Sequence, residues 1–177
     1  RFVNLDMNIT SPPNKHLLNE LKQLISETRI QVASAINSGI VILNWKVGRR
    51  ISDEILHNRR AEYGKTIVVT LSRELVEQFG RNYEEKNLRR MIQFAEKFPD
   101  FENVVTLSRH LSWSHFLAII PLEGEAIDFY CKLAYNNVIG VRKLRELISV
   151  KTYERTENVN IQLQNSSMIE PDVFKDP

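Results

Sequence analysis

The chain has 177 residues, 42% of them hydrophobic and 26% charged, a composition typical of a soluble globular protein of one domain. Its formal net charge of +2 does not require a polyanionic partner, so any contact with nucleic acid must depend on local patches. No apolar run reaches the roughly 18 residues of a membrane span. No signal peptide opens the chain, so we expect a cytoplasmic protein without a membrane partner.

The N-terminal third of the chain predicts a leader followed by one long helix. Residues 1–14 lack hydrophobic periodicity and contain Ser11-Pro12-Pro13-Asn14, so we expect them to be disordered. From residue 16 to residue 58 apolar residues recur at steps of three and four, which predicts an amphipathic helix about 60 Å long. We expect a kink or break at Ser38-Gly39.

The residues after this expected break are apolar on more than one face of the helix. Ile40, Val41, Ile42 and Trp45 follow one another closely enough to surround it. Such a helix needs cover on all sides. The cover could come from the later helices or from a second copy of the chain, and the sequence leaves a homodimer open.

The middle of the chain has the pattern of a helix-turn-helix. We predict helices at Lys65–Phe79 and Glu84–Phe98, with the turn at Gly80–Tyr83. In the second helix the buried stripe is expected to be Leu88, Met91, Ile92 and Ala95.

The opposite face of the second helix has the residue types that contact nucleic acid. Long cations pair with phosphates, Arg pairs with guanine and Gln with adenine. The acidic pair Glu84-Glu85 argues against insertion of this helix into a groove by its N-terminus, and a charged face is often only solvated. The candidate contacts are Lys86, Arg89, Arg90, Gln93 and Lys97, with Arg73, Arg81 and Arg109 as second-rank phosphate contacts.

A hexapeptide of the first of these helices occurs twice. Val-Val-Thr-Leu-Ser-Arg stands at 68–73 and again at 104–109, and a short helix capped by Ser112 or Ser114 and ended by Pro121 should follow the second copy. A second, tandem helix-turn-helix unit is therefore an open alternative. His110 and His115, five residues apart, do not share a helical face. We expect them at the surface and predict no metal site.

Two further helices complete the predicted domain. Glu123–Tyr135 should place Tyr130 and Cys131 in the core, and Val141–Lys151 should expose a second basic patch. Because Cys131 is the only cysteine, an intrachain disulfide and a cysteine-based zinc site are excluded. Periodicity fades at Thr156, so we predict a helical domain over 15–156 and a linker over 157–177.

Motifs of catalysis do not occur in the sequence. There is no phosphate-binding glycine loop, no G-x-S-x-G and no H-E-x-x-H. The metal-dependent nuclease pattern, Pro-Asp followed downstream by Glu-x-Lys, also fails, because Glu84-Glu85-Lys86 precedes Pro99-Asp100. We therefore predict no catalytic residue, no metal and no cofactor, and do not expect the chain to be an enzyme by itself.

Ordered motifs along the chain resemble the N-terminal domain of the YhcG family. Most of the likeness lies in the stretches 44–51, 62–65, 70–75, 87–91, 94–100 and 107–116, and it continues through 153–156 to Val173–Pro177. Members tend to have a serine where this chain has Glu84, so Asn82 is expected to cap the second helix here.

The resemblance implies a helical, DNA-binding region joined to a C-terminal nuclease-type domain of the PD-(D/E)xK class, with Val173–Pro177 at the junction. Together, sequence and resemblance predict an all-α domain that binds nucleic acid, with DNA preferred, and presents it to that nuclease domain. The alternative is a protein–protein interaction or dimerisation scaffold without nucleic-acid contact.

Overall fold

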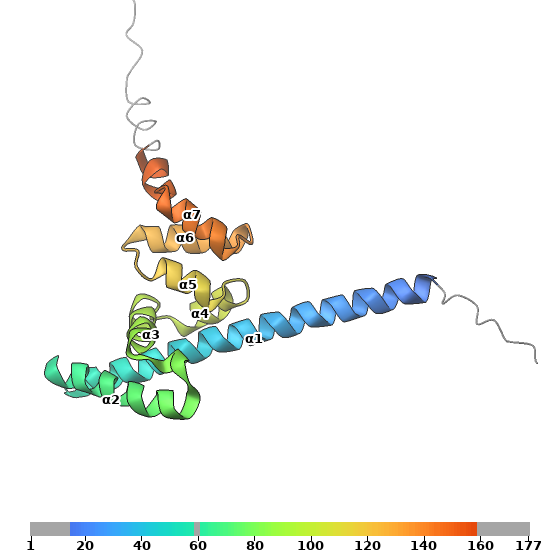
Figure 1. Ribbon diagram of the computed structural model, residues 1–177. Helices are drawn as coiled ribbons and strands as arrows, with labels where there is room; N and C mark the ends of the chain where they lie inside the picture. Colours follow the sequence, from blue (N-terminus) through green and yellow to red (C-terminus); the bar gives the residue numbers. More distant parts are fainter. Residues whose placement is uncertain (1–14, 59–60, 159–177) are drawn as a thin grey trace, which may run out of the picture. The chain divides into compact units, whose positions relative to one another are not determined.

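The computed structural model describes residues 15–58 and 61–158, and every regular element in these two ranges is helical (Figure 1). The predicted leader and all but the first two residues of the predicted linker lie outside them. The all-α prediction is confirmed, because the described residues contain no strand. The labelled elements are α1 (Lys15–Asn58), α2 (Ala61–Phe79), the 3-10 helix η1 (Arg81–Tyr83), α3 (Glu85–Lys97), α4 (Phe101–Ser108), α5 (Trp113–Ile119), α6 (Glu125–Asn136) and α7 (Val141–Ser149). Residues 152–158 are also helical.

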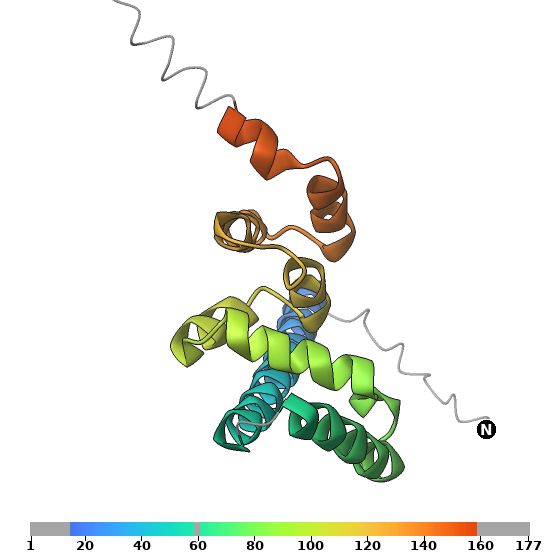
Figure 2. The same cartoon turned by 90° about the vertical axis from the view of Figure 1, so that its left-hand side faces the viewer.

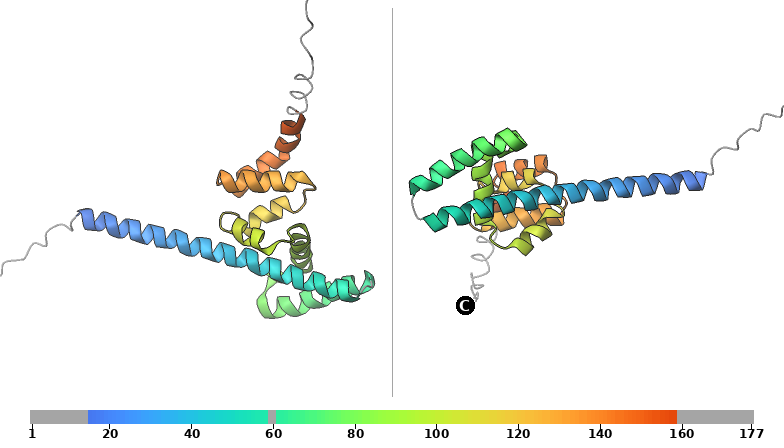
Figure 3. Two further views of the ribbon diagram at one scale, coloured as in Figure 1. Left: turned by 180° about the vertical axis from the view of Figure 1, so that it is seen from behind. Right: turned by 90° about the horizontal axis from the view of Figure 1, so that it is seen from below.

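The chain divides into two compact units, and the division falls within α1. In the described range the first unit is residues 15–36 and the second begins at Asn37. The helix itself is unbroken through Ser38 and Gly39 (Figure 3), so the predicted break there is wrong. A glycine inside a helix costs only about 1 kcal/mol. Ser38 is also held in place, because its hydroxyl donates to the carbonyl oxygen of Ser108 at 2.8 Å.

The first unit is a single helix whose large aliphatic side chains are all open to solvent. From Leu17 to Ile36 their exposed fractions lie between 40% and 69%. The residues between them are also exposed, with Ser34 half-buried.

The second unit has a large core that joins α1 and α3 to the helices that follow. Three aromatic rings occupy its middle: the centroids of Phe94 and Phe116 lie 4.6 Å apart, and those of Phe98 and Phe116 lie 5.4 Å apart. Val41 from α1 and Leu144 from α7 are fully buried in the same cluster. Phe94, which the predicted stripe of α3 omitted, is therefore central. Ile92, which that stripe included, is only half-buried.

A smaller cluster packs α1, α2 and α3 together around Ile51, Val68, Leu88 and Met91. Beside it a mostly apolar groove of about 520 Å³ remains open. It is lined by Lys46, Val47, Arg50, Ile51 and Glu54 of α1 and by Ile67, Leu71 and Leu75 of α2. The side chains that line it come from facing sides of these two helices.

Gly48 allows the backbones of α1 and α3 to approach closely. A Cβ atom at this position would overlap the backbone carbonyl of Met91, so no other residue fits without moving one of the helices. One turn earlier, the indole N–H of Trp45 donates to the carbonyl oxygen of Phe98 at 2.7 Å, and Phe98 is the C-cap of α3. The Trp-Lys-Val-Gly stretch, part of the resemblance, therefore serves to hold α3 against α1.

Short-range hydrogen bonds define the later helices. The Asp100 carboxylate caps α4 by accepting the N–H of Glu102 at 3.0 Å. Ser112, one of the two serines expected to cap α5, is its N-cap. Asn82 does not cap α3: it lies within η1, and the N-cap position belongs to Glu84, whose side chain makes no capping bond.

His115 corrects the expectation of a surface histidine. Its imidazole is buried, its Nδ1 accepts the backbone N–H of Ser112 at 3.0 Å, and its Nε2 lies 2.9 Å from the carbonyl oxygen of Ile139. Because Nδ1 accepts, Nε2 must hold the proton and donate to Ile139. The ring thus ties the start of α5 to the chain before α7. His110 is exposed and meets the Tyr135 ring edge-on at 4.7 Å.

The two copies of the hexapeptide share burial but not position within their helices. Val68 and Val104, the first residue of each copy, are both buried. The first copy lies in the middle of α2, whereas the second reaches the end of α4, where Arg109 is the C-cap. A helix–turn–helix order recurs as α4 and α5, with helices of 8 and 7 residues. A duplicated functional unit stays a prediction.

Candidate nucleic-acid interface

The helix α3 presents one face to the core and one to solvent. Leu88, Met91, Phe94 and Ala95 are buried, which directs the opposite face of the helix outward. Figure 2 shows α3 crossing the front of the second unit, with α2 below it. The predicted contacts Lys86, Arg89 and Gln93 are exposed on this outward face, and Arg90 at its edge is half-buried.

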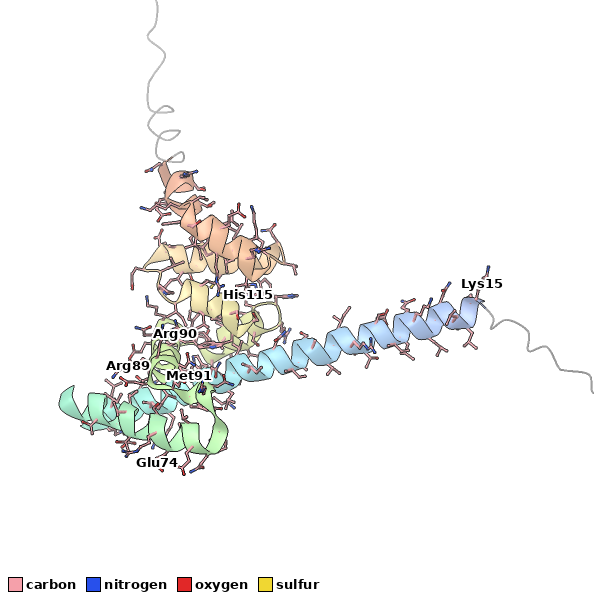
Figure 4. The ribbon with its side chains drawn as sticks, viewed as in Figure 1. Lys15, Glu74, Arg89, Arg90, Met91 and His115 are labelled. Carbon is pink, nitrogen blue, oxygen red and sulfur yellow. The ribbon has the colours of Figure 1, made fainter. Side chains whose placement is uncertain are left out.

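Arg89 is the candidate with the best-defined partner. Its Nε and Nη2 atoms donate to one Glu85 carboxylate oxygen at 2.9 and 2.6 Å. Both side chains are 46% exposed, and an exposed pair of this kind contributes about 1 kcal/mol or less to stability. A phosphate could therefore replace Glu85 at small cost. Figure 4 places Arg89 and Arg90 on neighbouring positions of α3.

Lys97 is bound more firmly than the other candidates. Its side chain is 22% exposed, and its ammonium donates to the carbonyl oxygen of Leu122 at 2.5 Å and to the carboxylate of Glu123 at 2.7 Å. These contacts connect the end of α3 to the segment between α5 and α6. A phosphate would have to displace both partners, which makes Lys97 the weakest of the five α3 candidates.

The remaining predicted residues lie on three different elements. Arg73 is exposed on α2, where its Nε is 3.7 Å from Glu74. Arg81 is exposed on η1, directly before α3, and Arg109 is exposed at the end of α4. Their elements differ, but η1 packs against both α2 and α3. Arg81 is therefore the second-rank residue nearest in the fold to the α3 face.

The helix α7 has exposed cations that were not among the predicted nucleic-acid contacts. Arg142 and Arg145 are exposed and, within residues 15–58 and 61–158, have no ion-pair partner. Glu146, the acidic residue on this helix, binds Lys143 at 3.0 Å instead. The sequence could have indicated this, since Arg145 has no acidic residue three or four positions away with which to form an ion pair along the helix.

Groups suited to catalysis do not gather in the described part of the chain. No cluster of three His, Cys, Asp or Glu side chains that could hold a metal occurs in residues 15–58 and 61–158. Cys131 is buried, and its burial together with nearby Asp128 raises its pKa to about 12, so its thiol stays protonated. Within the same residues, no helix is both long enough and apolar enough to cross a bilayer.

The described residues therefore form an all-helical domain in which a helix, a 3-10 turn and a second helix place a polar face outward. Comparison with known proteins goes one step further: residues 20–155 match the profile of the family described as "DUF1016 N-terminal domain". The chain belongs to this family.

One curated relative confirms the resemblance to the YhcG family. The chain is 25% identical over 164 residues to "Putative nuclease YhcG" of Escherichia coli strain K12, a match that covers 75% of this chain and 44% of the relative. The chain thus spans less than half the length of that relative. No solved structure matches the chain.

Proposed function

We propose that this domain binds DNA through the outward face of α3 and presents it to a nuclease-type domain outside this chain. The observation that supports the proposal most directly is the exposure of Lys86, Arg89 and Gln93 on a helix that follows a tight turn. The name of the curated relative and its greater length support the link to a nuclease domain.

The energetics of the face favour phosphate binding over a purely structural role. Lys86 has no polar partner among the described residues, and the Arg89–Glu85 pair is exposed. An exposed pair of this kind stabilises the free protein little. Each of these cations can replace a counterion on DNA, and each replacement adds to the salt dependence of binding. Gln93 lies one turn from Arg89 and Arg90 and has the amide that can pair with adenine.

A titration of a fluorescent DNA duplex at increasing salt tests the proposal. The double variant Arg89→Ala with Arg90→Ala should weaken binding about tenfold or more at low salt and reduce the slope of log affinity against log salt by about 1 to 2. Arg49→Ala with Arg50→Ala is the control, because it removes two neighbouring exposed arginines of α1 that each form an i,i+4 ion pair, as Arg89 does. The control should change affinity about twofold or less.

Three results would reject this interface. They are no binding at low salt, equal losses in both double variants, and a loss confined to Arg142→Ala with Arg145→Ala. The last would place the contact on α7.

A dimerisation or docking scaffold is the second candidate function. The specific observation that favours it is the exposed aliphatic surface of residues 17–36.

A further inference from the structure

The first unit presents an apolar stripe with nothing of that unit covering it. The stripe consists of seven large aliphatic residues with Thr28 and Ala35 between them, and all nine are exposed. Its large members are Leu17, Leu18, Leu21, Leu24, Ile25, Val32 and Ile36.

Five of the seven large residues of the stripe follow a seven-residue repeat. Leu18, Ile25 and Val32 are seven apart, and so are Leu17 and Leu24. A seven-residue repeat has a period of 3.5, which is that of helices that wind around one another rather than of a helix lying on a globular core. In proteins most of the stability of an amphipathic helix comes from packing of its apolar face. The stripe is therefore suited to pairing with another helix of the same repeat.

The charges beside the stripe follow the same repeat and differ between its two edges. At about 100° per residue, Lys15, Lys22 and Arg29 line one edge, whereas Glu20 and Glu27 line the other. All five side chains are exposed. One edge is therefore basic and the other acidic.

Two-fold symmetry relates these edges in only two ways. In a parallel pair the basic edge of each helix lies along the acidic edge of its partner, on both sides of the contact. In an antiparallel pair basic meets basic and acidic meets acidic, which is unfavourable. From the seven-residue repeat and this charge complementarity we infer that residues 17–36 bind the same stripe of a second copy of the chain, in parallel, as a coiled coil.

Ile30 provides a control for the stripe within the same helix. It is 69% exposed and lies on the opposite face, about 180° from the centre of the stripe. A lysine at Ile25 would enter the contact, whereas a lysine at Ile30 would stay in solvent. Both variants change the same residue type on an exposed position, so neither should affect the core of the second unit.

Light scattering coupled to size exclusion, over a concentration series of the 177-residue chain, measures the association. We expect a dimer that dissociates on dilution, a monomer for Ile25→Lys at all concentrations, and a dimer for Ile30→Lys. A chain that is monomeric throughout would overturn the inference, and so would an Ile30→Lys variant as disrupted as Ile25→Lys.

Cross-linking distinguishes the two orientations. In a Cys131→Ala background, Leu18→Cys and Val32→Cys should each form a covalent dimer under mild oxidation, because equal positions meet in a parallel pair. If only a mixture of the two variants cross-links, the helices are antiparallel and the inference is wrong. This result does not depend on the DNA binding that we propose for α3 of the second unit.

Discussion

The two parts of α1 differ in what covers them, although they are continuous and equally periodic. Residues 17–36 expose every large aliphatic side chain. Residues 41–52 bury Val41, Asn44, Ile51 and Ser52 and bring Gly48 against α3. Periodicity shows that a helix has an apolar face, but it does not show whether other helices of the same chain bury that face. Pairs of the same residue type at differently covered positions along α1 test this difference.

Two glycines of α1 should give the largest contrast. Gly48→Ala places a methyl group on the backbone carbonyl of Met91, so we expect the free energy of unfolding of the second unit to fall by about 3 kcal/mol or more. Gly39→Ala meets no atom within 4 Å and should be neutral or stabilising by up to about 1 kcal/mol. Urea unfolding followed by circular dichroism measures both. Equal effects would show that α1 and α3 do not approach as described.

Two valines should differ by a smaller amount. Val41 is 0% exposed and Val32 is 53% exposed. Val41→Ala should lower the stability of the second unit by about 2 kcal/mol at every protein concentration, because it leaves a cavity in the core. Val32→Ala should change that stability by about 0.5 kcal/mol or less, and any loss of association should disappear on dilution. Calorimetry at two concentrations separates these effects, and a concentration-dependent loss for Val41→Ala would contradict the assignment.

Two serines give the smallest contrast. The Ser38 hydroxyl donates to the carbonyl oxygen of Ser108 across 70 residues, whereas the Ser26 hydroxyl donates to Lys22 within its own helix. Ser38→Ala should cost about 1 kcal/mol, since Ser108 loses a bond in a buried setting. Ser26→Ala should cost about 0.5 kcal/mol or less. In thermal melts, Ser38→Ala should lower the Tm by a few degrees, and Ser26→Ala should not.

Local signals predicted the elements of the second unit closely. The helix α2 ends just before Gly80, and α3 ends two residues before Pro99, each within a residue of the expected end. These ends were predictable because glycine and proline determine the backbone conformation of the residues next to them. Ser112 begins α5 for a similarly local reason. At Ser38-Gly39, by contrast, a local signal failed, because a single glycine costs less than the rest of a 44-residue helix supplies.

Contacts between residues far apart in the chain could not be predicted from the sequence. Nothing near His115 in the sequence indicates that the carbonyl oxygen of Ile139, 24 residues later, will accept a hydrogen bond from its ring. Likewise, helical spacing alone predicts Lys97 to be a free cation, whereas its ammonium donates to Leu122 and Glu123. The candidate face of α3 could be predicted because it depends on helical spacing alone. The availability of each cation depends on partners elsewhere in the fold.

The two tryptophans have a practical consequence for spectroscopy. Trp45 donates its indole N–H to Phe98, and Trp113 packs 5.4 Å from the Phe94 ring, so both report on the core of the second unit. Residues 15–36 contain no Trp, Tyr or Phe. Intrinsic fluorescence should therefore follow the unfolding of the second unit alone, while far-ultraviolet ellipticity follows both. The difference between the two curves would isolate the melting of residues 15–36 without a label.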